Sequence, residues 1–124
     1  MTLPLILIVD DDKLTRWAVS RILGRAGYQV CEAGSLTEGA IALESQRPDV
    51  ILLDIRLPDG DGFALLKAVQ FGHPDLPVIM MTAHASPETE QAALALGARG
   101  HLAKPCDPTE LQAVIGDALT RGVS

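Results

Sequence analysis

Acidic, hydroxyl and amino side chains stand directly after four separate apolar runs of the sequence. These side chains are Asp10, Asp11 and Asp12 after residues 5–9, Asp54 after residues 50–53, Thr82 after residues 78–81, and Lys104 after residues 100–103. If the runs are parallel strands of one sheet, their carboxyl ends meet at the edge where open α/β sheets bind ligands. The polar residues would then form a single site.

Carboxylates gathered at one edge of a sheet need a cation. Two of them about 4 Å apart repel by roughly 4 kcal/mol at an effective dielectric constant of about 20. Oxygen ligands suit a hard ion such as Mg²⁺, which keeps several waters and bridges to phosphate. The Thr82 hydroxyl could donate to one phosphoryl oxygen, and the Lys104 ammonium could pair with another. Asp54, alone after its run, is then the candidate nucleophile, and an aspartyl phosphate is the product.

Each of these residues also has a simpler interpretation. The three consecutive aspartates could form a solvated turn and a helix cap, and Asp54 could be a turn residue before a Pro/Gly-rich loop. The Thr82 hydroxyl could bond to backbone, and Lys104 could be a surface lysine. Because all of them fall at the ends of successive apolar runs, we favour one functional site.

The elements that must position this site alternate between short apolar runs and longer amphipathic segments. The apolar runs are residues 5–9, 28–31, 50–53, 78–81 and 100–103. The first, third and fourth are apolar throughout, which is typical of parallel strands buried on both faces. Five strand–helix units predict an α/β domain with right-handed crossovers.

The intervening segments carry helix signals. Leu14, Trp17, Ala18, Ile22 and Leu23 recur at helical spacing before Gly27. Ser35 with Glu38 predicts a capping box, and Gly62 should precede the third helix. Ser86 before Pro87 and Asp107 before Pro108 predict the starts of the last two helices.

Composition limits the classes of partner. The chain has 124 residues, and its 10 basic and 16 acidic side chains give a formal net charge of −6. Since an acidic surface repels phosphate backbones, we do not expect this domain to bind DNA or RNA. Aromatic residues make up only 3%, which argues against base-stacking surfaces. The length fits a single domain over residues 1–124.

The N-terminal apolar run and the two cysteines indicate the compartment. Residues 3–9 are too short to span a bilayer and lack the preceding basic residues of a signal peptide. Cys31 and Cys106 form no C-x-x-C motif and fit small apolar side chains in a reducing compartment. We therefore expect a cytoplasmic protein that does not interact with membranes.

Four segments resemble the receiver domain of bacterial two-component response regulators. They are Ile8-Val9-Asp10-Asp11-Asp12, residues 53–62 (LDIRLPDGDG), Met81-Thr82-Ala83-His84 and Lys104-Pro105. The resemblance covers essentially the whole chain and is strongest to receivers of nitrogen-regulation-type activators. It implies a flavodoxin-like, doubly wound (βα)5 fold of the α/β class, with a five-stranded parallel sheet in the order 2-1-3-4-5.

The resemblance implies a role for each site residue. Asp54 would accept a phosphoryl group from a sensor histidine kinase or a phosphotransfer protein. The implied Mg²⁺ ligands are Asp11 directly, Asp10 chiefly through water, Asp54, and the backbone carbonyl of Arg56. Thr82, the Ala83 amide and Lys104 would hold the phosphoryl group, and the Lys104-Pro105 peptide would be cis. Asp12 matches a variable position without a defined role.

The resemblance further implies a switch, with one departure from the family pattern. Phosphorylation would draw Thr82 inward and change the face formed by the fourth helix, fifth strand and fifth helix, which would control an output, a partner or a homodimer. Three residues before Lys104 the family has tyrosine or phenylalanine, and here the residue is His101. We expect this ring to point outward in the inactive form and to respond to pH.

Two functions of other classes fit less well. A haloacid-dehalogenase-type phosphatase resembles this site, but such enzymes place a second aspartate two residues after the nucleophile, where this chain has Arg56. A flavodoxin-like electron carrier would need a hydroxyl-rich phosphate loop where three aspartates stand. We therefore expect a signalling domain that catalyses only its own phosphorylation and dephosphorylation, either alone or as part of a longer regulator.

Overall fold

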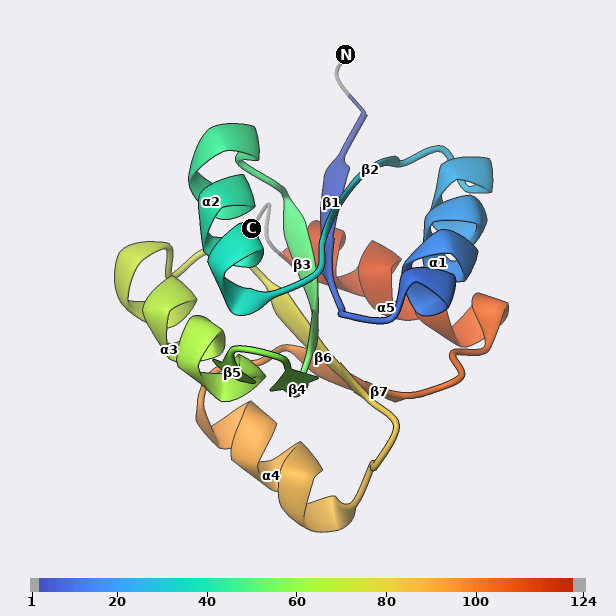
Figure 1. Ribbon diagram of the computed structural model, residues 1–124. Coiled ribbons are helices and arrows are strands. Elements are labelled where there is room, and N and C mark those ends of the chain that lie inside the picture. The colour runs from blue at the N-terminus through green and yellow to red at the C-terminus, as the bar shows by residue number, and fades with distance from the viewer. Residues whose placement is uncertain (1–2, 122–124) are drawn as a thin grey trace.

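Five parallel strands form the centre of the structure. The computed structural model describes residues 3–121, and its main strands are β1 (Leu5–Val9), β2 (Gln29–Ala33), β3 (Val50–Asp54), β6 (Val78–Thr82) and β7 (Gly100–Ala103). The strands lie in the order β2-β1-β3-β6-β7 (Figure 1). This confirms the predicted order 2-1-3-4-5, since β6 and β7 are the fourth and fifth strands of this sheet. The expected α/β class is also confirmed.

Helices cover both faces of the sheet, as Figure 1 shows. One layer holds α1 (Lys13–Arg25) and α5 (Pro108–Arg121), and the other holds α2 (Leu36–Gln46), α3 (Gly62–Gly72) and α4 (Pro87–Ala95). Successive residues of β1 serve the two layers: Ile8 packs in the cluster of α1 and α5, and Val9 in the cluster of α2, α3 and α4. None of the helices within residues 3–121 is long and apolar enough to cross a membrane.

The predicted helix starts are confirmed, with one difference. The Ser86 hydroxyl caps α4 through a reciprocal pair with Thr89, and the Asp107 carboxylate accepts the Glu110 amide at 3.0 Å. Ser35 caps α2 by accepting the Glu38 amide at 3.1 Å. The Glu38 carboxylate, however, accepts the amide of Gly34 rather than that of Ser35, so the predicted capping box forms only in part.

The predicted apolar stripe of the first helix is wrong at its N-terminal half. Leu14 and Trp17 are 73% and 59% exposed, and Ala18 is exposed as well. The buried face of α1 instead carries Val19 and Leu23. At 100° per residue these two lie on the side of the helix opposite to Leu14 and Trp17, so the structure leaves an apolar surface uncovered.

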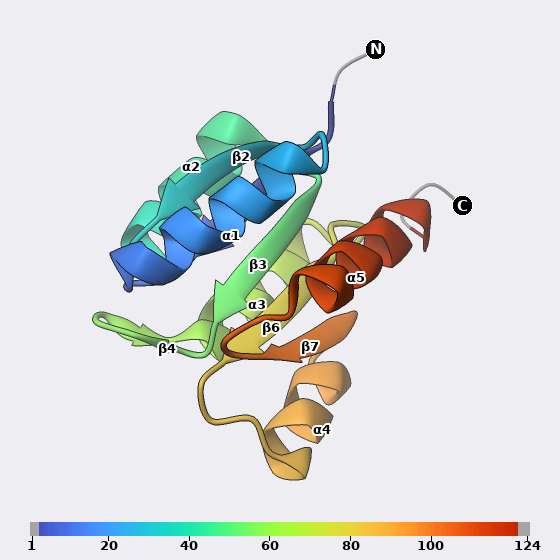
Figure 2. The ribbon, with the colours of Figure 1, turned by 90° about the vertical axis from the view of Figure 1, so that its right-hand side faces the viewer.

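A short hairpin that the sequence did not predict connects β3 to α3. Its strands are β4 (Arg56–Leu57) and β5 (Gly60–Asp61), which pair antiparallel. The hairpin extends from the carboxyl end of the sheet (Figure 2). At its base the Gly62 amide donates to the Ile55 carbonyl at 2.6 Å, and a Cβ atom at Gly62 would lie 2.1 Å from the Asp54 carbonyl oxygen. No side chain fits at this position.

We predict that Gly62→Ala lowers the free energy of unfolding by about 2–3 kcal/mol, because the added methyl group would collide with backbone at the end of β3. The matched control is Gly24→Ala in α1, where a Cβ meets nothing within 4 Å. That change should stabilise the protein by roughly 0.5–1 kcal/mol, as alanine does in helix interiors. Urea unfolding of both variants measures the difference, and equal stability of the two would contradict the close approach.

Candidate functional site

The polar residues predicted from the sequence meet at the carboxyl edge of the sheet. Asp10 directly follows β1, Asp54 ends β3, Thr82 ends β6 and Lys104 directly follows β7. Asp10, Asp54 and Thr82 are buried, at 0%, 6% and 3% exposure. The strand register explains the gathering, because Asp54 lies opposite Met81 in β6, and Thr82 lies opposite Ala103 in β7.

Lys104 joins two of the carboxylates. Its Nζ atom lies 2.8 Å from Asp54 Oδ2 and also forms an ion pair with Asp10 Oδ2. The Lys104 amide donates to the Thr82 carbonyl at 2.8 Å, which ties the end of β7 to β6. The Lys104-Pro105 peptide is cis, as predicted. Backbone contacts therefore place the ammonium between the ends of β1 and β3.

Burial and charge shift the pKa values of this cluster in opposite senses. Burial raises the pKa of the Asp10 carboxyl, and the bonds from Lys104 and the Asp12 amide only partly offset that rise. Burial alone would lower the pKa of the Lys104 ammonium, but its contacts with Asp10 and Asp54 outweigh that effect and raise it. These contacts thus favour the charged ammonium, while burial makes ionisation of Asp10 less favourable than that of a free aspartate.

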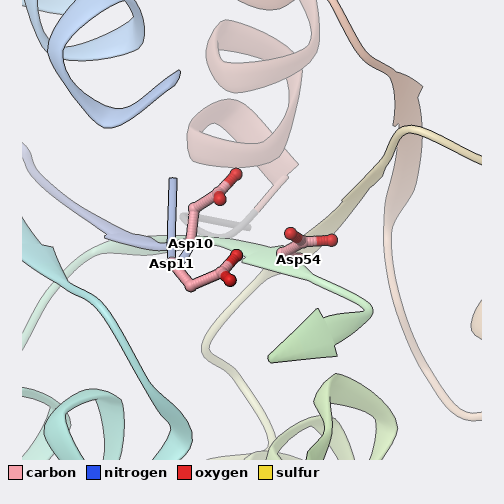
Figure 3. Close-up of side chains that lie close together, drawn as sticks. All are labelled: Asp10, Asp11 and Asp54. Atoms are coloured by element: carbon pink, nitrogen blue, oxygen red, sulfur yellow. The ribbon is translucent and has the colours of Figure 1, made fainter. Parts of the chain in front are cut away.

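Three carboxylates form a cluster with the composition of a metal site. One oxygen from each of Asp10, Asp11 and Asp54 lies within 4.8 Å of the others (Figure 3). Asp10 Oδ2 is buried with the Lys104 ammonium as its partner, and this single positive charge cannot balance three carboxylates. Oxygen donors that crowd together in this way fit a hard divalent cation.

Two neighbouring residues support this cluster from outside. Asp12 caps α1, where its carboxylate accepts the Leu14 amide at 3.1 Å and the Thr15 hydroxyl at 2.7 Å. The Thr15 bond is the main cause of the lowered pKa of Asp12. Arg16 donates to the Asp10 carbonyl and pairs with Glu32 at 3.1 Å. Sequence reasoning missed this role of Arg16, because its carbonyl partner leaves no mark in the pattern of side chains.

The other predicted site residues, Arg56, Thr82 and Ala83, lie around the acidic cluster. The Arg56 amide donates to Asp54 Oδ1 at 3.3 Å, and the Arg56 side chain is exposed. The Thr82 hydroxyl accepts the His84 amide at 3.1 Å, so it serves the following loop rather than Asp54. Ala83 is exposed at the start of that loop.

His101 lies on the same face of the sheet as Thr82. Because Leu102 packs toward α5, strand alternation turns His101 toward the opposite layer, where α4 contacts β7. The imidazole is half-buried, and its Nε2 atom is shielded from solvent without a hydrogen-bond partner. The covering layer thus shields part of the ring, and the outward orientation expected for the inactive form stays a prediction.

Comparison with known proteins places this site in a family. Residues 6–116 match the response regulator receiver domain, so the chain belongs to that family. Accepting a phosphoryl group from a kinase is the general function of receiver domains in two-component systems.

Similar proteins agree with this placement. The DNA-binding transcriptional regulator NtrC of Salmonella typhimurium is 41% identical over 116 residues, which are 94% of this chain and 25% of that protein. The chain thus spans about a quarter of the length of such relatives. The solved CheY-like receiver domain protein of Methanospirillum hungatei has a TM-score of 0.92 at 34% identity, over 98% of both chains. The receiver domain of NtrX from Brucella abortus has a TM-score of 0.88 at 34% identity, over 93% of this chain and 98% of that one.

We predict that Lys104→Met lowers the free energy of unfolding of the metal-free protein by about 1–3 kcal/mol at neutral pH, because two buried carboxylates lose their cation. Without Lys104 the pKa of Asp10 should rise further above its ordinary value. A raised carboxyl pKa costs stability only above that ordinary value, so the loss should shrink as the pH falls toward about 4. Urea unfolding in a chelator at both pH values measures it.

The matched control is Lys67→Met on the exposed surface of α3, which should change stability little at either pH. A loss for Lys104→Met that is the same at neutral and acidic pH would contradict the ion-pair origin of the effect.

Proposed function

We propose that the chain accepts a phosphoryl group on Asp54 from the phosphohistidine of a sensor kinase or phosphotransfer protein, in a Mg²⁺-dependent reaction. The observation that carries this proposal is the asymmetry of the Asp54 carboxylate. Its Oδ2 atom is held by Lys104 at 2.8 Å, whereas Oδ1 receives only the long 3.3 Å bond of the Arg56 amide. Oδ1 is thus the less engaged oxygen beside an acidic metal cluster.

The proposed chemistry is a balanced transfer. An Asp54 oxygen forms a bond to phosphorus while the bond from phosphorus to the donor imidazole nitrogen breaks, and the electron pair stays on that nitrogen. The Lys104 ammonium and the Thr82 hydroxyl would bind phosphoryl oxygens, helped by the Ala83 amide. Bound Mg²⁺ would supply further charge neutralisation, held by Asp10, Asp11, Asp54 and the Arg56 carbonyl.

The uncovered apolar surface of α1 fits a role in binding the phosphodonor. Leu14 and Trp17 are exposed on the first turns of α1, directly after the acidic cluster. With Arg16 and Glu32 they line a hollow of about 510 Å³. A partner that packs on these residues would bring its phosphohistidine to the carboxyl edge of the sheet.

The face formed by α4, β7 and α5 is the proposed output surface. Thr82 ends β6 and leads into the loop before α4, so movement of its hydroxyl toward a phosphoryl group would pull on that loop. Leu94 of α4 is 48% exposed. We propose that phosphorylation changes this face and thereby controls a partner, an output domain or a homodimer.

Phosphorylation should depend on Asp54 and on the metal. With acetyl phosphate and Mg²⁺ we expect the intact mass to increase by one phosphoryl group, and we expect no gain with Asp54→Asn or in excess chelator. The control is Asp61→Asn, which lies in the same connection and can still accept the Phe63 amide. It should be phosphorylated normally. An Asp54→Asn protein that still gains one phosphoryl group would refute the assignment.

His101 is proposed to take part in the switch as a neutral ring. When Thr82 moves toward the phosphoryl group, the space beside it can accept the ring, and a protonated imidazole would resist burial. The charged residues of α4 are Glu88 and Glu90, and neither forms an ion pair with His101 in the described chain. Activation should therefore weaken as the solution becomes acidic.

The measurement is NMR of the His101 ring with and without beryllofluoride, from pH about 5.5 to about 8. We expect a response to this phosphoryl mimic at the higher pH that fades at the lower. In the control variant His101→Phe, NMR signals of α4 replace those of the ring, and their response to beryllofluoride should not depend on pH through residue 101. If the His101 signals ignore the mimic at every pH, the residue has no part in the switch.

A further inference from the structure

The tip of the β4–β5 hairpin is bound to the start of α2. Asp59 Oδ1 accepts the Leu36 amide at 2.8 Å, and Oδ2 accepts the Thr37 amide at 3.0 Å and the Thr37 hydroxyl at 2.8 Å. These bonds, the Leu36 amide first, lower the pKa of the Asp59 carboxyl. The carboxylate thus occupies the positive end of a helix dipole more than twenty residues away in sequence.

The hairpin has a second fixed point at its base. Gly62 leaves no room for a side chain against the Asp54 carbonyl, and its amide donates to the Ile55 carbonyl. Between the two fixed points the ribbon is short, since only Arg56 with Asp61 and Leu57 with Gly60 are paired. At Gly60, φ is +148° and a Cβ would lie 2.8 Å from Leu36 Cδ1, so the tip also packs closely on α2.

A two-residue ribbon is too short to hold its own position. Isolated hairpins are at best marginally stable even when they are longer. The position of Arg56 therefore depends on the base at Gly62 and on the tip at Asp59. Loss of the tip contact would let the ribbon move, and ordering it again would cost free energy whenever a ligand needs the Arg56 carbonyl in one place.

We propose that Asp59 is a positioning residue, which holds the hairpin against α2 so that the Arg56 carbonyl stays in place for the metal at the acidic cluster. This inference rests on the proposed Mg²⁺-dependent function and adds a residue to it that touches neither the metal ligands nor Asp54. In this proposal the start of α2 helps to hold the hairpin beside the phosphorylation site in position. The expected consequence is weaker metal binding in a protein that is otherwise folded.

The experiment measures Mg²⁺ binding to the unphosphorylated protein by calorimetry. Asp59→Ala should raise the dissociation constant about two- to fivefold, a ratio typical of an interaction at a helix terminus. Hydrogen exchange of the Leu36 and Thr37 amides should speed up in the same variant without metal. Asp59→Asn keeps one acceptor oxygen but no charge, and it should fall between the wild type and Asp59→Ala in both measurements.

The chain offers a matched control at the opposite end of the sheet. Asp49 is also exposed and accepts a distant backbone amide, that of Leu5, at 2.8 Å. Asp49→Ala should leave Mg²⁺ affinity unchanged, whereas Asp11→Ala should reduce it strongly. Faster exchange at Leu36 and Thr37 with unchanged Mg²⁺ affinity would overturn the proposal and leave Asp59 as a simple helix cap.

Failure of this inference can be told apart from failure of the proposed function. If the wild-type chain binds Mg²⁺ and is phosphorylated on Asp54 while Asp59→Ala matches it in both respects, only the positioning role is refuted. If the wild-type chain neither binds Mg²⁺ nor gains a phosphoryl group, the proposed function is refuted, and the positioning role falls with it.

Discussion

Two buried carboxylates on adjacent strands share one ammonium, and the rest of the site is arranged around that pair of contacts. Asp10 and Asp54 both bind Lys104, which follows the edge strand β7. Burying two such charges is unfavourable unless a cation stays between them. The ends of β1, β3 and β7 must therefore keep a fixed relation, and the sheet provides it through the parallel register of buried apolar strands.

Backbone hydrogen bonds hold the ends of β1, β3 and β7 in their relative positions. The Asp10 amide donates to the Ala33 carbonyl, its own carbonyl accepts from Arg16, and the Lys104 amide donates to the Thr82 carbonyl. Each bond ties a site residue to a neighbouring strand or helix. The carboxylates and the ammonium can then exchange partners without movement of the sheet, which is what a site needs if it gains and loses a phosphoryl group.

The sequence predicted the sheet and the main site because both depend on local patterns. Apolar runs of four residues that are followed by Asp54 or Thr82 identify buried strands and their functional ends at once. The hairpin of residues 56–61 was missed, because two-residue strands leave no periodicity. The exposed side of α1 was misjudged at Leu14 and Trp17, since helical spacing alone does not say which apolar face meets the sheet. The contact of Asp59 with α2 was also invisible, because it joins a side chain to backbone amides.

The charge of the site supports its proposed role as a switch. Three carboxylates face one ammonium at this site, and burial already raises the pKa of the Asp10 carboxyl. A phosphoryl group on Asp54 carries about −1.5 to −2 charges in place of one, so the phosphorylated site is more negative than the resting one whatever cation it holds. That excess negative charge would attract hydrogen-bond donors that are not bonded to Asp54 in the unphosphorylated protein. The Thr82 hydroxyl at the end of the neighbouring strand β6 is one such donor, and it accepts the His84 amide. In the proposed function its proton would bind the phosphoryl group, and that movement would pull on the loop before α4. In the proposed function, the crowding of carboxylates that calls for a cation would therefore also drive the change at the output face.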